Sequence, residues 1–320
     1  MAEETGQGVP DIAAVLIAGP TASGKSAAAL ELASRFGGVI VNADSMQVYD
    51  ELRILTARPN LDEERLVLHR LYGTVSAAER YSVGRWLADV EAVLEEEKAL
   101  RRLPILTGGT GLYFKALAEG LAATPEIPAE IRERWRSRAE TLTPAELHEE
   151  LCERDPAMAE RLPETDPQRI VRALEVFEAT GVSLADWQAE EATPLLPPEQ
   201  TLRMVVAPDR AELYAKIDRR FDAMLQRGAL DEIRVLAELN LSPELPAMRA
   251  HGVPELLDAL EGKISREEAI ETSKTMSRRY AKRQLTWARR FMADWHWVES
   301  AAEAVEFASA RLGRSEAATP

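Results

Sequence analysis

The sequence has little of what several classes of protein require. Its 320 residues include a single cysteine, Cys152, which excludes an internal disulfide framework and a metal site built on several cysteines. It contains no run of about 18–20 consecutive apolar residues, the length that a membrane-spanning helix needs. Its first residues, MAEETGQGVPD, are acidic and polar, unlike a secretory signal. We therefore expect a cytoplasmic protein that acts without a membrane.

Basic residues are also in deficit, because 54 Asp and Glu residues outnumber 39 Lys and Arg residues and leave a formal net charge of −15. Proteins that bind nucleic acid usually carry a basic surface. Net charge is an average over the chain, however, and does not exclude a local basic surface. The four histidines lie far apart in the sequence and predict no zinc site. They are His69, His148, His251 and His296.

The clearest motif that is present is GPTASGKS, residues 19–26. It matches G-x-x-x-x-G-K-[ST], a loop whose backbone N–H groups and following helix N-terminus bind the oxygens of a di- or triphosphate. Lys25 adds a positive charge, and the Ser26 hydroxyl is a candidate ligand for Mg²⁺. We predict a diphosphate site formed by Gly19, Thr21, Ala22, Ser23, Gly24, Lys25 and Ser26.

Short apolar runs alternate with helical patterns through much of the chain. The helical patterns include 25–36 and 81–102, the second with Ser82 as a candidate N-cap. Strands that are apolar throughout and alternate with helices predict an α/β fold, with a parallel sheet covered on both faces. The strands are expected at 13–19, 38–45, 103–111 and 201–208.

The composition changes between about residues 120 and 200, where the chain becomes rich in Glu and Arg, is interrupted by Pro, and contains no strand pattern. Three helical signatures in this stretch are bounded by Pro or Gly. We therefore predict a core of 1–119 and 201–320 that contains a helical insertion domain at 120–200.

One acidic residue stands at the end of a predicted strand. P-loop ATPases and GTPases normally hold Mg²⁺ with an Asp after another strand, but the third strand here ends ILTGGTG without an acid. Asp44 follows the second strand instead, where strand ends face the ligand crevice. It is a metal ligand, a general base, or the N-cap of a short helix starting at Ser45. Thr110 lies in a second glycine turn and either donates to a phosphate or substrate amine or only caps the turn.

The long helical pattern at 265–291 carries a basic stripe. Between Lys274 and Arg290 the chain has seven basic residues and no acidic one. At about 100° per residue, these side chains fall within one half of the helix circumference. In a protein of net charge −15, a surface that contacts RNA phosphates is the favoured interpretation, and ion pairs elsewhere are the alternative. The stripe consists of Lys274, Arg278, Arg279, Lys282, Arg283, Arg289 and Arg290.

A further amphipathic helix is expected at 218–233. Arg219 and Arg220 lie early on it, and the sequence pattern alone does not decide which of the two reaches the phosphate site.

Five motifs, in this order, carry a resemblance to a known family: GPTASGKS, ADSMQVY, GGTGLYFKAL, DPQRIVRALEV and KRQLTWARR. Over about residues 13–298 the chain closely resembles the tRNA dimethylallyltransferase (isopentenyltransferase) family, bacterial type. The resemblance implies a P-loop-kinase-like core and a helical insertion that grips the anticodon stem-loop of tRNA. It also implies transfer of a dimethylallyl group from dimethylallyl diphosphate to N6 of adenosine 37, in tRNAs reading codons that begin with U.

The resemblance also implies roles for individual residues. Asp44 would be the general base, Thr110 would place the amine and the leaving group, and Arg220 would act with Lys25, Ser26 and Mg²⁺ on the departing diphosphate. We expect a monomer. The residues implied to contact tRNA are Asp44, Ser45, Met46, Gln47, Gln168, Arg169, Ile170, Val171, Arg172, Arg249, Lys282, Arg283, Gln284 and Trp287.

The sequence departs from the family pattern in two places. Leu55 stands where the family usually has a glycine, and AHGVPEL, residues 250–256, replaces a stretch that usually reads IGY. These departures leave open the RNA contacts around His251. Two rival functions use the same loop: an ATP-dependent small-molecule or nucleotide kinase, which leaves the basic stripe without a role, and a nucleotide-switched RNA-binding protein without transferase activity.

Overall fold

The structure is a computed structural model that describes residues 12–122, 124–190 and 192–316. The chain forms two compact units, one of Met1–Ala118 with Leu195–Pro320 and one of Glu119–Pro194. Residues 195–200, which composition groups with the insertion, thus belong to the sheet unit. The Leu196 backbone N–H donates to the Leu117 carbonyl at 3.0 Å, and the Leu196 side chain is buried in the core of that unit.

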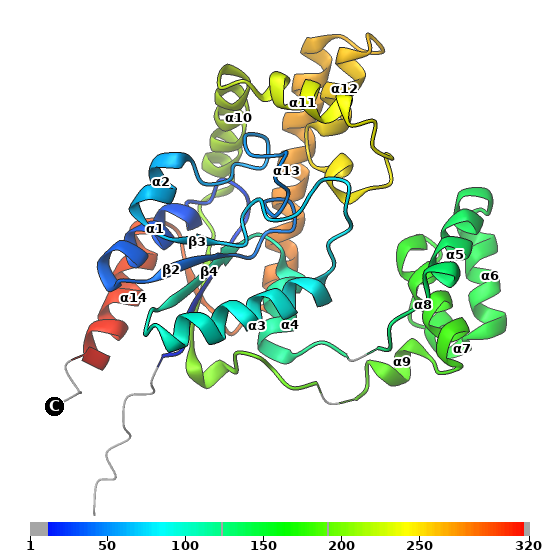
Figure 1. Ribbon diagram of the computed structural model, residues 1–320, viewed down its shortest axis with the longest axis horizontal. Coiled ribbons are helices and arrows are strands. Elements are labelled where there is room, and N and C mark those ends of the chain that lie inside the picture. Colours follow the sequence, from blue (N-terminus) through cyan, green and yellow to red (C-terminus); the bar gives the residue numbers. More distant parts are fainter. Residues whose placement is uncertain (1–11, 123, 191, 317–320) are drawn as a thin grey trace, which may run out of the picture. The chain divides into compact units, whose positions relative to one another are not determined.

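The larger unit, hereafter the core unit, is built on six parallel strands in the order β3-β2-β4-β1-β5-β6 (Figure 1). Every residue of β1, β2 and β4, three of the four inner strands, is buried, as their apolar sequences predict. The predicted α/β fold with a parallel sheet is confirmed. The strands are β1 Ala14–Ala18, β2 Val39–Asn42, β3 His69–Arg70, β4 Pro104–Gly108, β5 Thr201–Val206 and β6 His296–Val298.

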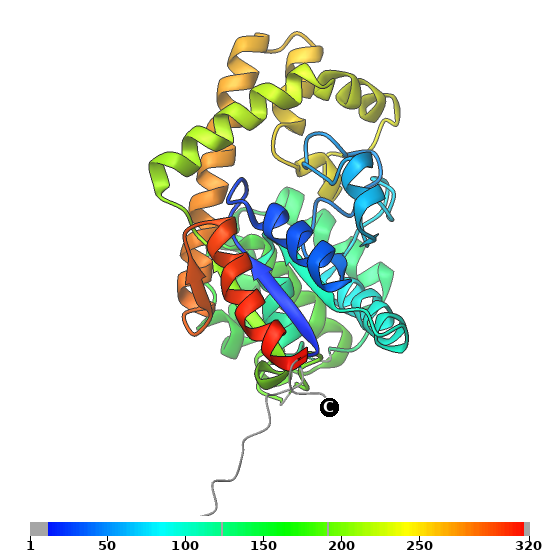
Figure 2. The same ribbon diagram turned by 90° about the vertical axis from the view of Figure 1, so that its left-hand side faces the viewer.

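Helices cover both faces of this sheet because successive side chains of a strand point to opposite faces. Ile17 of β1 packs in one cluster with residues of α1 (Lys25–Phe36) and α14 (Ala301–Glu316), which lie side by side in Figure 2. Its neighbour Leu16 packs in a second cluster with residues of α3 (Val83–Ala99) and α4 (Gly111–Glu119). The six-residue helix α2, Leu61–Leu66, contributes no buried residue.

Two further pairs of helices complete the core unit. The segment 218–233, expected as one helix, is divided between α10 (Arg210–Gln226) and α11 (Ala229–Glu238), so that prediction is wrong. Gly228 separates them with φ +98°, a left-handed conformation that favours glycine and ends the helix. The second pair is α12 (Val253–Leu260) and α13 (Arg266–Phe291), which pack against each other. Two 3₁₀ helices are η1 Pro198–Gln200 and η2 Pro246–Arg249.

The smaller unit, hereafter the helical unit, has its own hydrophobic core. Trp135 is 1% exposed, and its indole N–H donates to the Glu178 carboxylate at 2.7 Å. Pro and capping residues set the helix starts, as at Thr143, which forms a capping box with Glu146. The helices are α5 Ala129–Thr141, α6 Pro144–Arg154, α7 Pro156–Ala159, α8 Pro167–Thr180 and α9 Leu184–Trp187.

None of the helices in the described ranges has both the length and the hydropathy needed to cross a bilayer.

Candidate active site

The glycine loop joins β1 to α1 as the motif requires. Gly24 adopts φ +99° and begins α1, and Ala22 is also left-handed, with φ +64°. A Cβ at Gly19 would lie 2.6 Å from the Val206 carbonyl oxygen, so only glycine fits beside β5. Within the described part of the chain no side chain caps α1, which leaves the first N–H groups of this helix available to an anion.

Lys25 lies at the start of α1 with its charge directed into the loop. Its Nζ donates to the Pro20 carbonyl at 3.1 Å. Burial lowers the pKa of Lys25 to about 8, the charge of Asp44 opposes this shift, and the charge of Arg220 adds to it. The nearby charge of Asp44 thus offsets only part of the effect of burial on Lys25, and an anionic ligand would stabilise the charged amine further. Ser26 is exposed beside it.

Arg220, rather than Arg219, reaches the glycine loop. Its guanidinium, on α10, donates to the Thr21 hydroxyl, whereas Arg219 is exposed. Burial lowers the pKa of Arg220 to about 10, against the opposing charge of Asp44, so the side chain remains a cation at neutral pH. The structure thus places a second cation beside Lys25, on the Thr21 side of the loop.

Asp44 is held rigidly just beyond β2. Asn42, which is completely buried, accepts from the Asp44 N–H at 2.8 Å and donates to the Asp44 carbonyl at 2.9 Å. One carboxylate oxygen, Oδ1, accepts from the Met46 N–H at 2.9 Å, forming a turn rather than the N-cap of a helix at Ser45. The other oxygen, Oδ2, lies toward Gly109.

Thr110 follows β4 and contacts Ser45, which follows Asp44 after the neighbouring strand β2. The Thr110 hydroxyl accepts from the Ser45 N–H at 2.9 Å and donates to the Ser45 hydroxyl at 3.3 Å. Close approach of the two strand ends requires glycine, because a Cβ at Gly108 would lie 2.0 Å from the Ala43 carbonyl oxygen. The turn therefore places a hydroxyl and a carboxylate on adjacent strand ends.

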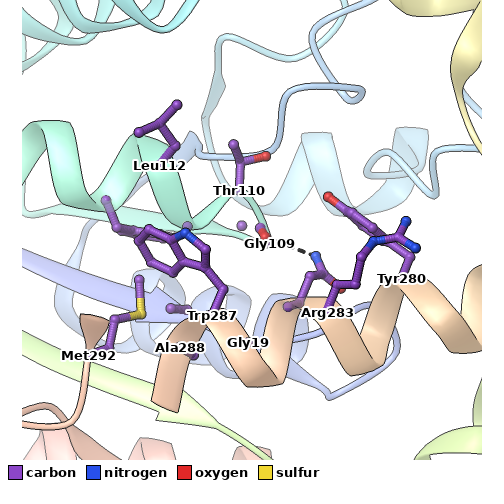
Figure 3. Close-up of a pocket in the computed structure, with 14 residues that line it drawn as sticks. Gly19, Gly109, Thr110, Leu112, Tyr280, Arg283, Trp287, Ala288 and Met292 are labelled. Atoms are coloured by element: carbon purple, nitrogen blue, oxygen red, sulfur yellow. Dashed lines mark hydrogen bonds between the residues drawn. The ribbon is translucent and has the colours of Figure 1, made fainter. Parts of the chain in front are cut away.

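A cavity of about 230 Å³ opens between this turn and α13 (Figure 3). Gly19 of the glycine loop lines it together with Thr110, Tyr280 and Arg283. Apolar side chains make up much of the remaining wall, so the cavity joins a polar region to a region suited to hydrocarbon. Those side chains are Ala18, Leu112, Phe114, Trp287, Ala288 and Met292.

Gln284 of α13 ties together the two glycine turns. Its amide oxygen accepts from the Thr21 N–H at 3.0 Å, and its amide nitrogen donates to the Gly109 carbonyl at 2.9 Å. Trp287, one turn further along the helix, lies against Gly111, where a Cβ would come within 2.2 Å of the indole ring. Both residues, implied as tRNA contacts by the resemblance, also line the cavity.

The basic stripe on α13 divides into two parts. Lys274 pairs with Asp222 at 2.7 Å, and Arg278 pairs with Asp218, both on α10. These two residues form ion pairs of the kind that the alternative interpretation expects. The exposed members of the stripe are Arg279, Lys282, Arg283, Arg289 and Arg290.

The other residues implied to contact tRNA are distributed over both units. Gln47, in the core unit, donates to the carbonyls of Thr56 and Ala57 at 2.8 and 3.0 Å. Met46 is partly buried beside it, and Arg249, also in the core unit, is exposed and pairs with Glu244.

In the helical unit the implied contacts lie at the start of α8. Gln168 and Arg169 are exposed. Arg172 donates to the Thr124 hydroxyl at 3.0 Å, and Val171 is partly buried. Ile170 is completely buried, because it faces the core of this unit, so its side chain offers no surface to RNA.

Three residues with evident roles in the site were missed as site residues from the sequence. Asn42 positions Asp44, and the signal for it was a polar residue at the end of an otherwise apolar strand. Tyr280 lines the cavity one turn before Gln284. His251 packs against the Tyr280 ring, with centroids 4.5 Å apart, and only the fold brings α12 and α13 together.

These features define a class of protein: a P-loop α/β protein in which two cations of the glycine-loop region, a carboxylate and a hydroxyl lie near one another, beside a cavity lined by Gly19 and Thr110. The family model for IPP transferase matches residues 47–291. The chain therefore belongs to the IPP transferase family.

Curated and solved relatives agree with this assignment. The chain is 57% identical over 285 residues to the tRNA dimethylallyltransferase of Nitrobacter hamburgensis, which covers 89% of this chain and 90% of that protein. It is similar to a solved tRNA isopentenylpyrophosphate transferase from Bacillus halodurans, with 31% identity, a TM-score of 0.67, and coverage of 94% and 97%. A solved eukaryotic dimethylallyltransferase acting on tRNA gives 29% identity, a TM-score of 0.77, and coverage of 89% and 73%.

Proposed function

We propose that the protein transfers a dimethylallyl group from dimethylallyl diphosphate to N6 of adenosine 37, in tRNAs that read codons beginning with U, and releases diphosphate. The observation that carries the proposal is a cavity with a largely apolar wall that is lined by Gly19 of the glycine loop and by Thr110, with Asp44 close to both Lys25 and the Thr110 turn. Membership of the IPP transferase family supports the same reaction. An ATP-dependent kinase is not favoured, since the solved relatives are transferases that act on tRNA.

The residues suit the reaction step by step. The N6 amine attacks the first carbon of the allylic chain, the bond from that carbon to the diphosphate oxygen breaks, and its electron pair leaves with the diphosphate. The exocyclic amine of adenine must lose a proton as it attacks, and Asp44 accepts this proton. The loop N–H groups, Lys25 and Arg220 stabilise the charge that develops on diphosphate. The target base leaves its stack to enter the cavity.

A divalent metal fits the protein oxygens near the loop only when the bound diphosphate supplies further ligands. Among the described residues no three His, Cys, Asp or Glu side chains gather to form a metal site. Mg²⁺ usually retains waters and binds substrate phosphates with one or two protein oxygens. The exposed Ser26 hydroxyl at the start of α1 is such an oxygen. When bound there, Mg²⁺ would supply positive charge to the diphosphate.

Two surfaces are suited to the RNA. On α13, Lys282 and Arg283 are exposed beside the cavity-lining Gln284. On the helical unit, Gln168 and Arg169 are exposed at the start of α8, and we assign this unit to the anticodon stem-loop. The basic side chains Lys282, Arg283 and Arg169 can bind phosphates through charge, which gives affinity that depends on salt.

The test uses purified protein, Mg²⁺, dimethylallyl diphosphate and unmodified tRNA with adenosines at positions 36 and 37, without ATP. Mass spectrometry of the digested tRNA should show N6-dimethylallyladenosine. A tRNA with guanosine at position 37 is the matched control and should remain unmodified. Absence of product, together with phosphorylation of a small acceptor once ATP is added, would assign the protein to the kinases instead.

A further inference from the structure

Tyr280 lines the cavity but has no role in the reaction as proposed above. It lies on α13, one helical turn before Gln284, and lines the cavity together with Thr110 and Arg283. Figure 3 shows its phenol oxygen directed into the cavity on the side of Thr110. Its ring packs against protein, and its hydroxyl lies within hydrogen-bonding reach of the Gln284 and Thr110 side chains.

Two neighbours hold the ring of Tyr280. The His251 ring packs against it with centroids 4.5 Å apart and planes inclined by 49°. The Arg283 guanidinium lies over the same ring at 5.5 Å from its centroid, a distance at which cation–π attraction acts. With its ring held by these contacts, the hydroxyl has little freedom to turn away from the cavity.

The backbone fixes His251 in this position. The next residue, Gly252, has φ +94° and begins α12, and a Cβ there would come within 3.2 Å of the Phe221 ring. Burial lowers the pKa of His251, the charge of Arg283 lowers it further, and Asp44 acts in the opposite direction. The imidazole is therefore neutral at neutral pH and packs beside Arg283 without charge repulsion.

The hydroxyl of Tyr280 stays protonated throughout the physiological range. Burial and the nearby charge of Asp44 raise its pKa, while Arg283, Gln284 and Thr110 lower it to a smaller extent. A protonated phenol is a hydrogen-bond donor. In Figure 3 the hydroxyl lies on the side of the cavity where Thr110 and Arg283 are found, and Trp287 of the apolar wall lies on the other side.

We propose that Tyr280 is a further catalytic residue, whose hydroxyl donates a hydrogen bond to the diphosphate oxygen that leaves the allylic carbon, and that His251 is its positioning residue. The inference rests on the proposed prenyl transfer. In this step the carbon–oxygen bond breaks, the nitrogen–carbon bond forms, and the amine proton passes to Asp44. The Tyr280 proton stays on its own oxygen and stabilises charge that exists only as the bond breaks.

The experiment measures single-turnover transfer to tRNA with enzyme in excess, together with the affinities for donor and tRNA. We expect Tyr280→Phe to slow the chemical step by about 10- to 100-fold, with both affinities within a few-fold of wild type, because the missing bond forms in the transition state. Tyr49→Phe is the matched control. Tyr49 is buried and does not line the cavity, so removal of its hydroxyl should leave the rate unchanged.

The positioning role of His251 is tested by a double-mutant cycle. His251→Ala should slow the step several-fold in the presence of Tyr280, and should have no effect on rate when combined with Tyr280→Phe. His251→Phe, which keeps a ring against Tyr280, should restore most of the rate. A purely structural role would lower the rate in both backgrounds alike.

Three results would overturn the inference. They are a Tyr280→Phe rate equal to that of Tyr49→Phe, an effect confined to tRNA affinity, and additive effects of the two substitutions. Failure of the wild-type protein to form any dimethylallyl product would instead count against the proposed function, so the two outcomes are separable.

Discussion

At the scale of single residues, the main feature of the site is the electrostatic attraction between one carboxylate, Asp44, and two cations, Lys25 and Arg220. Burial lowers the pKa values of Lys25 and Arg220, whereas the charge of Asp44 raises them. Asn42 fixes the backbone of Asp44 and leaves one carboxylate oxygen outside the local turn. This arrangement places a carboxylate close to two cations, as the proposed base and diphosphate site require.

The first prediction separates a catalytic from a structural role for Asp44. Asp44→Asn keeps an oxygen that can accept from the Met46 N–H but removes the base. We expect turnover to fall by about 10²–10⁴-fold, the usual contribution of a general base. Binding of tRNA, measured by filter retention, should change little. Turnover near the wild-type level would mean that Asp44 only shapes the turn.

The second prediction concerns pH and follows from the lowered pKa of Lys25. In the free protein the Lys25 amine loses its proton as the pH rises through about 8. At higher pH the amine must therefore take up a proton when the diphosphate binds. Donor affinity should therefore be constant below about pH 7 and weaken by up to about tenfold per pH unit well above pH 8. Lys25→Arg, whose charge persists, should remove this dependence in a titration of donor binding. An unchanged slope in that variant would assign the titration to another group.

At the scale of elements, α13 serves two surfaces at once. Its first basic residues, Lys274 and Arg278, form ion pairs with Asp222 and Asp218 of α10. Further along the helix, Gln284 joins the glycine loop to the end of β4. The helix therefore fixes the cavity wall while its exposed side remains available for RNA.

The third prediction uses this division of α13. Joint replacement of Lys282 and Arg283 by Gln should weaken tRNA binding and reduce the slope of log affinity against log salt by about 1 for each RNA phosphate that is no longer neutralised. The matched control replaces Lys274 and Arg278 by Gln. It removes the same charge from the same helix, but from ion pairs, so the salt slope should stay at the wild-type value. Equal slopes for the two variants would contradict the assignment of the RNA surface.

At the scale of the whole molecule, the chain folds into two units with separate cores. The sheet, the glycine loop and the cavity all belong to the core unit. Glu119–Pro194 folds around its own cluster of apolar residues, which includes Trp135. A change in the core of the helical unit should therefore affect RNA binding without altering the donor site.

The fourth prediction tests that separation. Trp135→Ala removes a buried ring and the indole bond to Glu178, at a cost of about 3–5 kcal/mol to the helical unit. We expect weaker tRNA binding, unchanged donor binding, and faster hydrogen exchange confined to 119–194. Trp187→Phe is the control. It removes an indole N–H that has no partner among the described residues, so tRNA binding should persist. Weakened donor binding in Trp135→Ala would contradict the division.

The sequence by itself determined the features that depend on local pattern. The glycine loop, α1 over Lys25–Phe36 and α13 over Arg266–Phe291 were predictable, because apolar periodicity, capping residues and the spacing of glycines act over a few residues. The position of Asp44 after a buried strand was predictable for the same reason.

Only the tertiary structure decided which distant residues share the site. It placed Arg220 rather than Arg219 against Thr21, used Lys274 and Arg278 in ion pairs, and buried Ile170 in the core of its unit. These outcomes depend on the direction in which one helix faces another, and a one-dimensional pattern does not contain that direction. For the same reason the contact of His251 with Tyr280 became visible only once α12 and α13 were packed together.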